Sequence, residues 1–322
     1  MSVLVYTENW DGRFKKLAYE LVSYASKLAE MLKTTTTVIS IGNVDDSELS
    51  KLGQFGADKI LTVKGDNLNV LDNRIFTAII SQAAEREKSE IIILPHNNTG
   101  KAVAPRLSAK LKSGIVTGVI SIPVSLGPFT VVKKVYSGKA FSKVTIKTKI
   151  KILTLAQNSY GLTETVKQGS IEEFKPEISK DLPVTQVMNT EKQKGKIILT
   201  DAEIVVSGGR GMKSPDNWGP IEELAELLGA ATACSRPVSD EGWRPHEEHT
   251  GQTGKIIAPN LYIAIGISGA IQHLAGISSS KNIVAINTDK EAPIFEAADY
   301  GIVGDAFKVL PELIKAIKEV KS

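Results

Sequence analysis

The chain has 322 residues, long enough for two domains, and its 39 Lys and Arg nearly balance its 36 Asp and Glu. The net charge of +3 gives no reason to expect a nucleic-acid partner or an anionic membrane surface. A single cysteine, Cys234, excludes an intrachain disulfide and a cysteine metal site, and it predicts a reducing, cytoplasmic compartment. The sequence enters a strand at once, so we expect no signal or transit peptide. We expect no membrane insertion, because no apolar run approaches the ~20 residues that span a bilayer.

The N-terminal half alternates between two hydrophobic patterns. Short apolar runs predict buried strands, whereas apolar residues that recur every three or four positions predict amphipathic helices. Strands and helices in alternation favour an α/β domain with a mostly parallel sheet. The expected strands are residues 3–6, 37–41, 59–63 and 90–94, and the expected helices are residues 14–32 and about 70–84.

Two segments further along this half carry polar side chains in informative patterns. Residues 96–106, after Pro95, form a polar turn that leads into an amphipathic helix at about 106–111. The turn is either a relic nucleotide pocket or a helix start capped by Thr99. Lysine and threonine alternate with mostly apolar residues from 143 to 151, which predicts a strand with one solvated face. That face lacks aromatic side chains, so it is a poor platform for nucleic acid.

A polar stretch with little periodicity divides the sequence. It covers residues 167–196 and is rich in Glu, Lys and Pro, which indicates a linker. We therefore expect one domain over residues 1–195 and a second over residues 196–322. The second domain opens with a strand at 202–207 that ends in Gly-Gly-Arg-Gly, and a helix follows at about 221–228.

The run over residues 261–276 has the pattern of a buried strand, a glycine turn and the first turns of a helix. Gly266 and Gly269 would let the backbone turn sharply and approach a ligand, and the opening N–H groups of the helix would face a phosphate or a flavin carbonyl. The G-x-x-G spacing departs from the G-x-G-x-x-G pattern of dinucleotide sites, and small-residue turns also occur where nothing binds. A second buried strand, residues 282–287, ends in an amide side chain.

A long irregular segment over residues 237–250 ends in the sequence Gly-Gln-Thr-Gly-Lys. Loops of this length are usually functional or disordered. The glycine sequence is not a phosphate-binding Walker loop, because the upstream glycine is missing and Ile256 follows the lysine. His246 and His249 are three residues apart, Pro245 precedes them and no third ligand is evident, so we do not expect a zinc site.

Residues 252–305 resemble the signature of the electron transfer flavoprotein α subunit family. The match begins at Gln252-Thr-Gly-Lys255 and ends at Ala298-Asp-Tyr-Gly-Ile-Val-Gly-Asp305, while Gly208-Gly-Arg-Gly211 and Ser235-Arg236 match upstream in the same order. The resemblance implies an N-terminal nucleotide-hydrolase-like α/β domain with a mostly parallel sheet, and a C-terminal doubly wound FAD-binding domain. It also implies noncovalent FAD and a heterodimer in which the N-terminal domain contacts a β subunit.

The resemblance also assigns residues to parts of the cofactor. Gln252 and Thr253 match residues that lie against the isoalloxazine, with the threonine hydroxyl near the reactive ring nitrogen, and His273 matches a histidine that donates to the pyrimidine carbonyl. Ser268 and the backbone over 269–272 fit the ribityl and phosphate region. The expected cofactor-binding residues are Arg210, Ser235, Arg236, Thr250, Gly251, Gln252, Thr253, Ser268, Gly269, Ala270, Ile271, Gln272, His273, Asn287, Asp305 and Ala306.

A cofactor-binding role explains why charged and polar residues stand at these positions, although some of them could instead cap a turn or a helix. Negative charge develops at the N1 and C2 carbonyl edge when a flavin takes up an electron, and Arg236 and His273 can stabilise it. Asn287 and Asp305 fit the adenosine end of the cofactor. Alternatively, Asn287 caps a turn and Asp305 caps the helix expected over residues 306–319.

The implied function is electron carriage rather than catalysis, since no credible nucleophile and base are paired in the sequence. Members accept electrons from flavin dehydrogenases, such as those that act on acyl-CoA in fatty acid β-oxidation, and pass them to a membrane quinone oxidoreductase. A bifurcating or pathway-dedicated member is the nearer alternative. A nicotinamide-dependent dehydrogenase is more distant, because its ribose-binding acidic residue and its catalytic acid or base are not identifiable.

Overall fold

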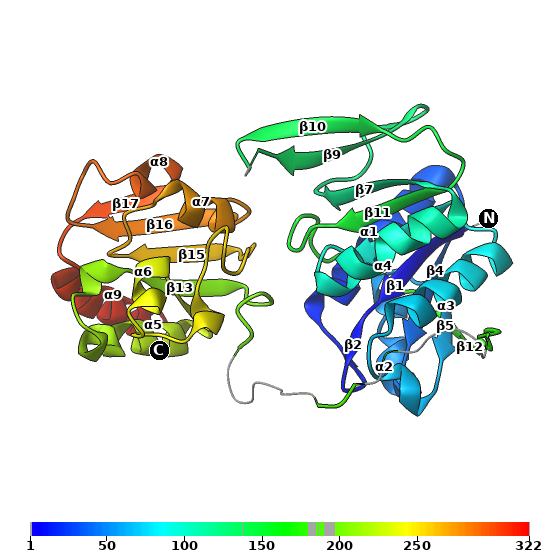
Figure 1. Cartoon of the computed structure of the whole chain (residues 1–322), viewed down its shortest axis with the longest axis horizontal. Helices are drawn as coiled ribbons and strands as arrows, with labels where there is room; N and C mark the ends of the chain where they lie inside the picture. The colour runs from blue at the N-terminus through cyan, green and yellow to red at the C-terminus, as the bar shows by residue number, and fades with distance from the viewer. Residues whose placement is uncertain (1, 137, 180–184, 186, 190–196, 322) are drawn as a thin grey trace. The chain divides into compact units, whose positions relative to one another are not determined.

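The computed structural model describes residues 2–136, 138–179, 185, 187–189 and 197–321 (Figure 1). The chain divides into two compact units, one of Met1–Val135 and Phe141–Thr190, the other of Tyr136–Ala140 and Glu191–Ser322. The domain boundary expected between residues 195 and 196 lies outside the described residues. Within the described ranges, no helix is long and apolar enough to cross a membrane.

The first unit is built on one sheet, whose described strands follow the order β10-β9-β7-β11-β6-β1-β4-β5-β12, with β8 paired to β9. The strands from β7 to β12 in this order pair in parallel, whereas β9 runs antiparallel to β7 and β8. The expected mostly parallel sheet is therefore confirmed. The strands are β1 Ser2–Thr7, β4 Thr35–Ile41, β5 Lys59–Val63, β6 Ile91–Pro95, β7 Gly114–Val119, β8 Ser125–Leu126, β9 Phe129–Val135, β10 Ala140–Thr145, β11 Lys151–Leu155 and β12 Ser170–Glu173, beside a separate pair, β2 Asn9–Trp10 and β3 Arg13–Phe14.

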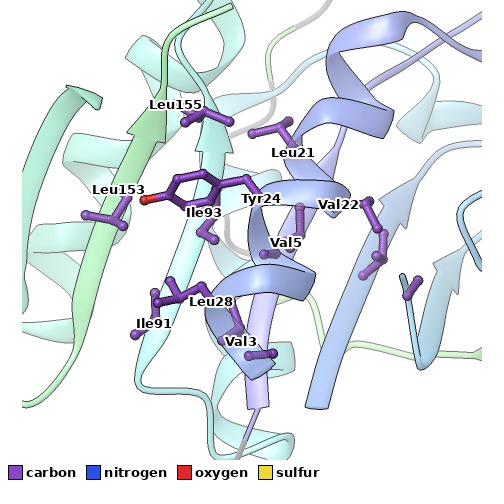
Figure 2. Close-up of a cluster of buried hydrophobic side chains, with 14 of the residues drawn as sticks. Val3, Val5, Leu21, Val22, Tyr24, Leu28, Ile91, Ile93, Leu153 and Leu155 are labelled. Atoms are coloured by element: carbon purple, nitrogen blue, oxygen red, sulfur yellow. The ribbon is translucent and has the colours of Figure 1, made fainter. Parts of the chain in front are cut away.

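Helices cover both faces of this sheet. Val3 and Val5 of β1 pack with α1, whereas Leu4 and Tyr6 pack with α3 and α4, because successive side chains of a strand point to opposite faces. Figure 2 shows Tyr24 and other α1 side chains lying over this face of the sheet. A strand that is buried on both faces is an unbroken apolar run in the sequence. The helices are α1 Lys16–Leu32, α2 Asp46–Ser50, α3 Asn73–Arg86 and α4 Asn98–Leu111, with 3-10 turns at Gly53–Phe55 and Asp66–Leu68.

The prediction of one continuous strand over residues 143–151 is wrong. The structure has the end of β10, a turn, and the start of β11 in its place. The Thr148 hydroxyl shapes the turn, since it accepts from the Gly114 N–H and donates to the Ile150 carbonyl, both at 2.7 Å. The alternating pattern continues through the turn because alternation does not reveal where a strand's pairing ends.

The predictions that the next helix, α4, lies at about residues 106–111 and that Thr99 caps its start are also wrong. The helix begins at Asn98, and its cap is Asn97, whose side chain accepts from the Gly100 N–H at 3.0 Å. The Thr99 hydroxyl, expected to be the cap, instead donates to the carboxylate of Glu8 at the end of β1. Both side chains can cap a helix, and both also donate to the Glu8 carboxylate, so this helix start is organised by a tertiary partner about ninety residues earlier in the chain.

The expected linker over residues 167–196 contains a strand. β12 pairs with β5 at the edge of the first sheet, and the Lys167 ammonium is 2.8 Å from Asp58. An edge strand is half solvated and commonly carries charged side chains, so its polar sequence resembles a linker. The remaining stretch includes residues 180–184, 186 and 190–196, which lie outside the described residues.

Glu20 of α1 is a buried carboxylate that fixes the loop after β11. Its side-chain oxygens accept from the N–H groups of Asn158, Tyr160 and Gly161 at 2.8, 2.8 and 3.0 Å. Burial of a carboxylate is costly unless hydrogen bonds replace its water, and hydrogen bonds to a charged acceptor are the strong ones. Glu20 therefore attaches the loop to α1, together with Ser23, whose hydroxyl accepts from the Thr163 N–H at 3.0 Å.

The second unit is a sheet of five described strands, all parallel, in the order β14-β13-β15-β16-β17. Val206 and Ile265 pack with α5 and α9, whereas Val205 and Tyr262 pack with α7 and α8 on the other face. This is the doubly wound domain that the resemblance implied. Its elements are β13 Ile204–Gly208, β14 Ala231–Cys234, β15 Leu261–Ile265, β16 Asn282–Asn287, β17 Tyr300–Val303, α5 Gly219–Leu228, α6 Arg236–Asp240, α7 Ile271–Ile277, α8 Ile294–Ala297, α9 Ala306–Lys321, and 3-10 turns at Arg210–Met212, Pro215–Trp218 and His246–Glu248.

The segment expected to be irregular over residues 237–250 contains α6 and a 3-10 turn, so that expectation is partly wrong. Arg244 holds the segment in place. Its guanidinium donates two hydrogen bonds to Glu248, both at 2.8 Å, and one to Glu222 of α5 at 2.7 Å. It also lies 5.6 Å from the ring centroid of Trp218. Such tertiary contacts order short turns that have no hydrophobic period of their own.

We predict that Glu20→Gln lowers the free energy of unfolding by about 1–3 kcal/mol, because an amide NH₂ would face N–H donors that now have a charged acceptor. Urea unfolding followed by circular dichroism measures the change. Glu30→Gln is the matched control on the same helix, since Glu30 forms an exposed pair with Lys27. Equal losses in the two variants would contradict the role given to Glu20.

We predict that Glu248→Gln lowers the free energy of unfolding of the second unit by about 1–3 kcal/mol, because the half-buried Arg244 loses its bidentate partner. Glu223→Gln is the control, since its pair with Lys318 is half exposed, and it should cost less than about 1 kcal/mol. Tryptophan fluorescence in a Trp10→Phe background reports this unit through its remaining tryptophans, at 218 and 243. A Glu248 variant as stable as the control would refute the prediction.

Candidate functional site

A cavity of about 580 Å³ opens at the carboxyl ends of β13, β14, β15 and β16. The chain leaves β13 toward β14 on one side and β15 toward β16 on the other, so a topological switch point lies between β13 and β15. In doubly wound sheets, ligands bind in the crevice at this point. The cavity is lined by Arg210, Gly211, Ser235, Arg236, Pro237, His249, Thr250, Gly251, Gln252, Thr253, Gly266, Ile267, Ser268, Gly269, Ala270, Gln272, His273, Asn287, Asp289, Ala292 and Pro293.

Glycines form the floor between the two central strands. Gly266 has φ +62°, and its carbonyl accepts from the Gly211 N–H at 3.0 Å. A methyl group on Gly211 would lie 2.6 Å from the Gly266 Cα, so the two backbones are closer than any side chain would permit. Gly269, with φ +84°, similarly faces the backbone of Ile294.

The turn that carries Gln252 and Thr253 is attached to α7. The Gly251 N–H donates to Lys255 at 3.1 Å, and the Gln252 N–H donates to the Gln272 carbonyl at 2.7 Å. The side chains of Gln252 and Thr253 are exposed at the mouth of the cavity, while their backbone is held. This leaves two polar side chains on a fixed support, as a binding site requires.

Three polar atoms in the cavity wall are buried and make no hydrogen bond of good geometry within the described residues: Thr250 Oγ1, His249 Nδ1 and His273 Nδ1. Buried polar groups are normally paired, so each such atom indicates a missing ligand or water. Burial lowers the pKa of His273 to about 4 and also lowers the pKa of His249. Both imidazoles are therefore neutral near pH 7.

Positive charge lies at the rim of the cavity. The guanidinium of Arg236 is 3.2 Å from Asp240, and that of Arg210 is 3.8 Å from Glu241. These arginines are about two-thirds exposed, so the pairs are weak and can exchange partners at little cost. An anionic ligand can therefore recruit both guanidinium groups.

The structure brings thirteen of the sixteen expected residues to the cavity wall. Ile271, Asp305 and Ala306 do not line it. The Asp305 carboxylate accepts from the Phe307 N–H at 3.1 Å, as the helix-cap reading anticipates. Asn287 lines the cavity and also fixes a turn, since its side chain donates to the Ile267 carbonyl and accepts from the Asp289 N–H.

Sequence reasoning missed several wall residues. His249 was considered only as a metal ligand, yet it lies under the turn of Gly251 and Gly254, with its backbone carbonyl accepting from Lys255. Its position directly before Thr250 was the available signal. The other wall residues without an expected role are Pro237, Ile267, Asp289, Ala292 and Pro293, whereas Gly211 and Gly266 were expected as glycine-turn positions.

Comparison with known proteins agrees with this site. A family model described as the electron transfer flavoprotein domain matches residues 3–179, and one described as the electron transfer flavoprotein FAD-binding domain matches residues 198–278. The second match contains the glycine floor, the turn over 250–254 and the whole of α7. It ends before β16 and the residues that follow it.

Curated relatives match the chain over nearly its whole length. The electron transfer flavoprotein subunit alpha of Syntrophomonas wolfei is 37% identical, covering 98% of each chain, and that of Bacillus subtilis is 37% identical, covering 99% of this chain and 98% of its own. The acryloyl-CoA reductase electron transfer subunit beta of Anaerotignum propionicum is 32% identical, covering 100% of this chain and 96% of its own.

The cavity fits the group that the FAD-binding domain holds. It lies at the switch point of a doubly wound sheet, its unpaired polar atoms can meet a heterocycle, and its rim arginines can meet phosphates. The chain belongs to the electron transfer flavoprotein α subunit family, and it is an electron carrier rather than an enzyme.

Proposed function

We propose that the cavity holds one FAD noncovalently and that the chain carries electrons as half of a heterodimer with a β subunit. The observation that carries the proposal is the set of unpaired polar atoms in the wall, contributed by Thr250, His249 and His273. A flavin ring offers both donors and acceptors along its pyrimidine edge. It can therefore satisfy both hydroxyl and imidazole groups.

The parts of FAD can be assigned to the wall in order. The ring would lie against Gln252 and Thr253, with Ser235, Thr250 and Gly251 beside it. Ser268 and the backbone over 269–272, which includes the N–H of Ile271, would hold the ribityl chain and phosphates, and Arg210 would supply charge to a phosphate. Asn287 and, past β17, Asp305 and Ala306 would hold the adenosine end along the carboxyl edge of the sheet.

When bound, FAD supplies the electron-transfer chemistry that side chains lack. The protein's part is electrostatic. Arg236 provides positive charge at the rim and His273 provides a neutral imidazole in the wall, and both favour negative charge on the ring edge. Asp240 opposes this effect, because its carboxylate lies beside Arg236.

A β subunit is proposed to cover the flavin, since one small unit with an open cavity leaves much of such a ligand exposed. Electrons would arrive from flavin dehydrogenases, such as those acting on acyl-CoA in fatty acid β-oxidation, and leave to a quinone oxidoreductase. We place the heterodimer in the cytoplasm, a reducing compartment, because the single cysteine forms no disulfide.

A pathway-dedicated or bifurcating form is the second candidate. Support comes from the relative of Anaerotignum propionicum, whose printed name makes it an electron transfer subunit of an acryloyl-CoA reductase. The two candidates differ in how many flavins the heterodimer holds, which can be counted.

The chain should copurify with its β subunit as a yellow heterodimer, and it should hold FAD weakly when expressed alone. Absorbance and nucleotide release after denaturation count the cofactors. One FAD and one AMP per heterodimer support the ordinary carrier, whereas two FAD support a bifurcating form. A heterodimer without flavin, or tight stoichiometric FAD on the lone chain, would refute the proposed function.

We predict opposite shifts from two neighbouring substitutions. Arg236→Ala removes a positive charge and should lower the first reduction potential of the bound flavin, by the equivalent of about 1–3 kcal/mol. Asp240→Asn frees Arg236 from its carboxylate and should raise the potential. Dye-coupled reductive titration measures both, with His246→Ala as the unchanged control. Shifts of the same sign in the two variants would place the ring away from Arg236.

A further inference from the structure

Behind the cavity wall, two buried polar side chains form one hydrogen bond. The Tyr262 hydroxyl on β15 lies 2.8 Å from Nε2 of His273 on α7. Tyr262 is fully buried and His273 is 6% exposed. Tyr262 sits on the central strand of the sheet, with Val205 and Ile283 as its neighbours on the adjacent strands. Its hydroxyl is therefore fixed in place.

The protonation states of this pair follow from their surroundings. Burial lowers the pKa of His273 to about 4, against an opposing contribution from the Thr250 backbone, so the imidazole is neutral near pH 7. Burial raises the pKa of Tyr262, so its hydroxyl keeps its proton. A neutral imidazole carries one N–H, on either Nδ1 or Nε2, and the environment selects which.

The pairing with Tyr262 favours one of the two choices. The Tyr262 hydroxyl can donate to Nε2 only when this nitrogen is bare, which leaves the proton of a neutral ring on Nδ1. The Thr250 backbone also raises the pKa of His273, and because the Thr250 N–H donates to the Cys234 carbonyl, the group that acts on the imidazole is the Thr250 carbonyl.

We propose that Tyr262 is a positioning residue that fixes the tautomer of His273, so that Nδ1–H is the donor presented to the cavity. This deepens the proposed function and rests on it for the identity of the acceptor, a carbonyl oxygen of the flavin ring. His273 lines the cavity, and its Nδ1 is buried without a hydrogen bond of good geometry within the described residues. The pairing with Tyr262 makes this nitrogen a donor rather than an acceptor before any cofactor arrives.

The tautomer can be measured without flavin chemistry. In the heterodimer with ¹⁵N-labelled histidine, the ring nitrogens of a neutral imidazole differ widely in chemical shift according to which one carries the proton. The chain has four histidines, and the spectrum of His273→Asn assigns the signal of His273 by its loss. We expect Nδ1 protonated and Nε2 bare, with and without FAD, and a mixture of tautomers in Tyr262→Phe. A proton on Nε2 in the parent overturns the proposal.

A variant cycle tests the link to the cofactor. Tyr262→Phe should raise the FAD dissociation constant about 2- to 10-fold, the effect of one hydrogen bond. An asparagine at 273 can place an N–H near the position of Nδ1 and has no counterpart of Nε2. Tyr262→Phe should therefore add nothing further in a His273→Asn background. An equal effect in both backgrounds would mean that Tyr262 acts only through packing.

The control is Tyr24→Phe in the first unit, where a buried tyrosine donates to the Ser121 carbonyl. It should lower stability by a similar amount without changing FAD affinity or the imidazole spectrum. If the heterodimer binds no FAD, the proposed function fails. The tautomer measured by ¹⁵N shifts still decides the proposal in that case.

Discussion

The close approach of two backbones at the end of neighbouring strands governs the geometry of the second unit. β13 and β15 pair in parallel, and the chain then leaves them in opposite directions, which opens a crevice at their carboxyl ends. Gly211 and Gly266 meet at the floor of this crevice, with an N–H···O bond of 3.0 Å between them. A side chain on either residue would force the strands apart or fill the space. The depth of the cavity therefore depends on two hydrogen atoms where other residues have a Cβ.

Arginines around this crevice have different physical roles because they differ in burial. Arg244 is 14% exposed and bidentate to a buried carboxylate, so it anchors the segment that forms one wall. Arg210 and Arg236 are about two-thirds exposed, and their acidic partners, Asp240 and Glu241, belong to the segment that Arg244 anchors. Exposed pairs contribute little to stability, whereas breaking a buried pair is costly. The segment over residues 237–250 is therefore held in place by a buried ion pair, while its exposed carboxylates can release the two rim arginines to a ligand.

The sequence predicts strands well where a strand lies between two others in a parallel sheet. The expected strands 59–63 and 282–287 have the observed ends, because the middle of such a strand is a largely apolar run. The single strand expected over residues 143–151 is wrong, because an alternating pattern continues through the turn at Thr148, whose hydroxyl accepts from the Gly114 N–H. β12 was mistaken for linker, because an edge strand is polar. In each error the deciding contact joins residues far apart in the chain.

For the site residues, too, the sequence does not reveal contacts between elements that are far apart in the chain. The resemblance in sequence identified Gln252 and His273, but Tyr262 lies in an apolar strand pattern and carries no sign of a polar role until its hydroxyl is seen beside the imidazole. His249 was judged against metal-site spacing, and its place under a glycine turn is a tertiary fact. Polar partners of buried groups are fixed by packing between elements, which local periodicity does not encode.

Cys234, at the end of β14, has a practical consequence for experiments on motion. Its thiol is completely buried, and burial raises its pKa to about 12, so little thiolate is present at neutral pH. Thiolate is the form that reacts with maleimides and other alkylating probes. The native chain is therefore chemically silent toward such reagents. A cysteine introduced on either unit will take up a fluorophore or spin label at one place, without first removing the native thiol.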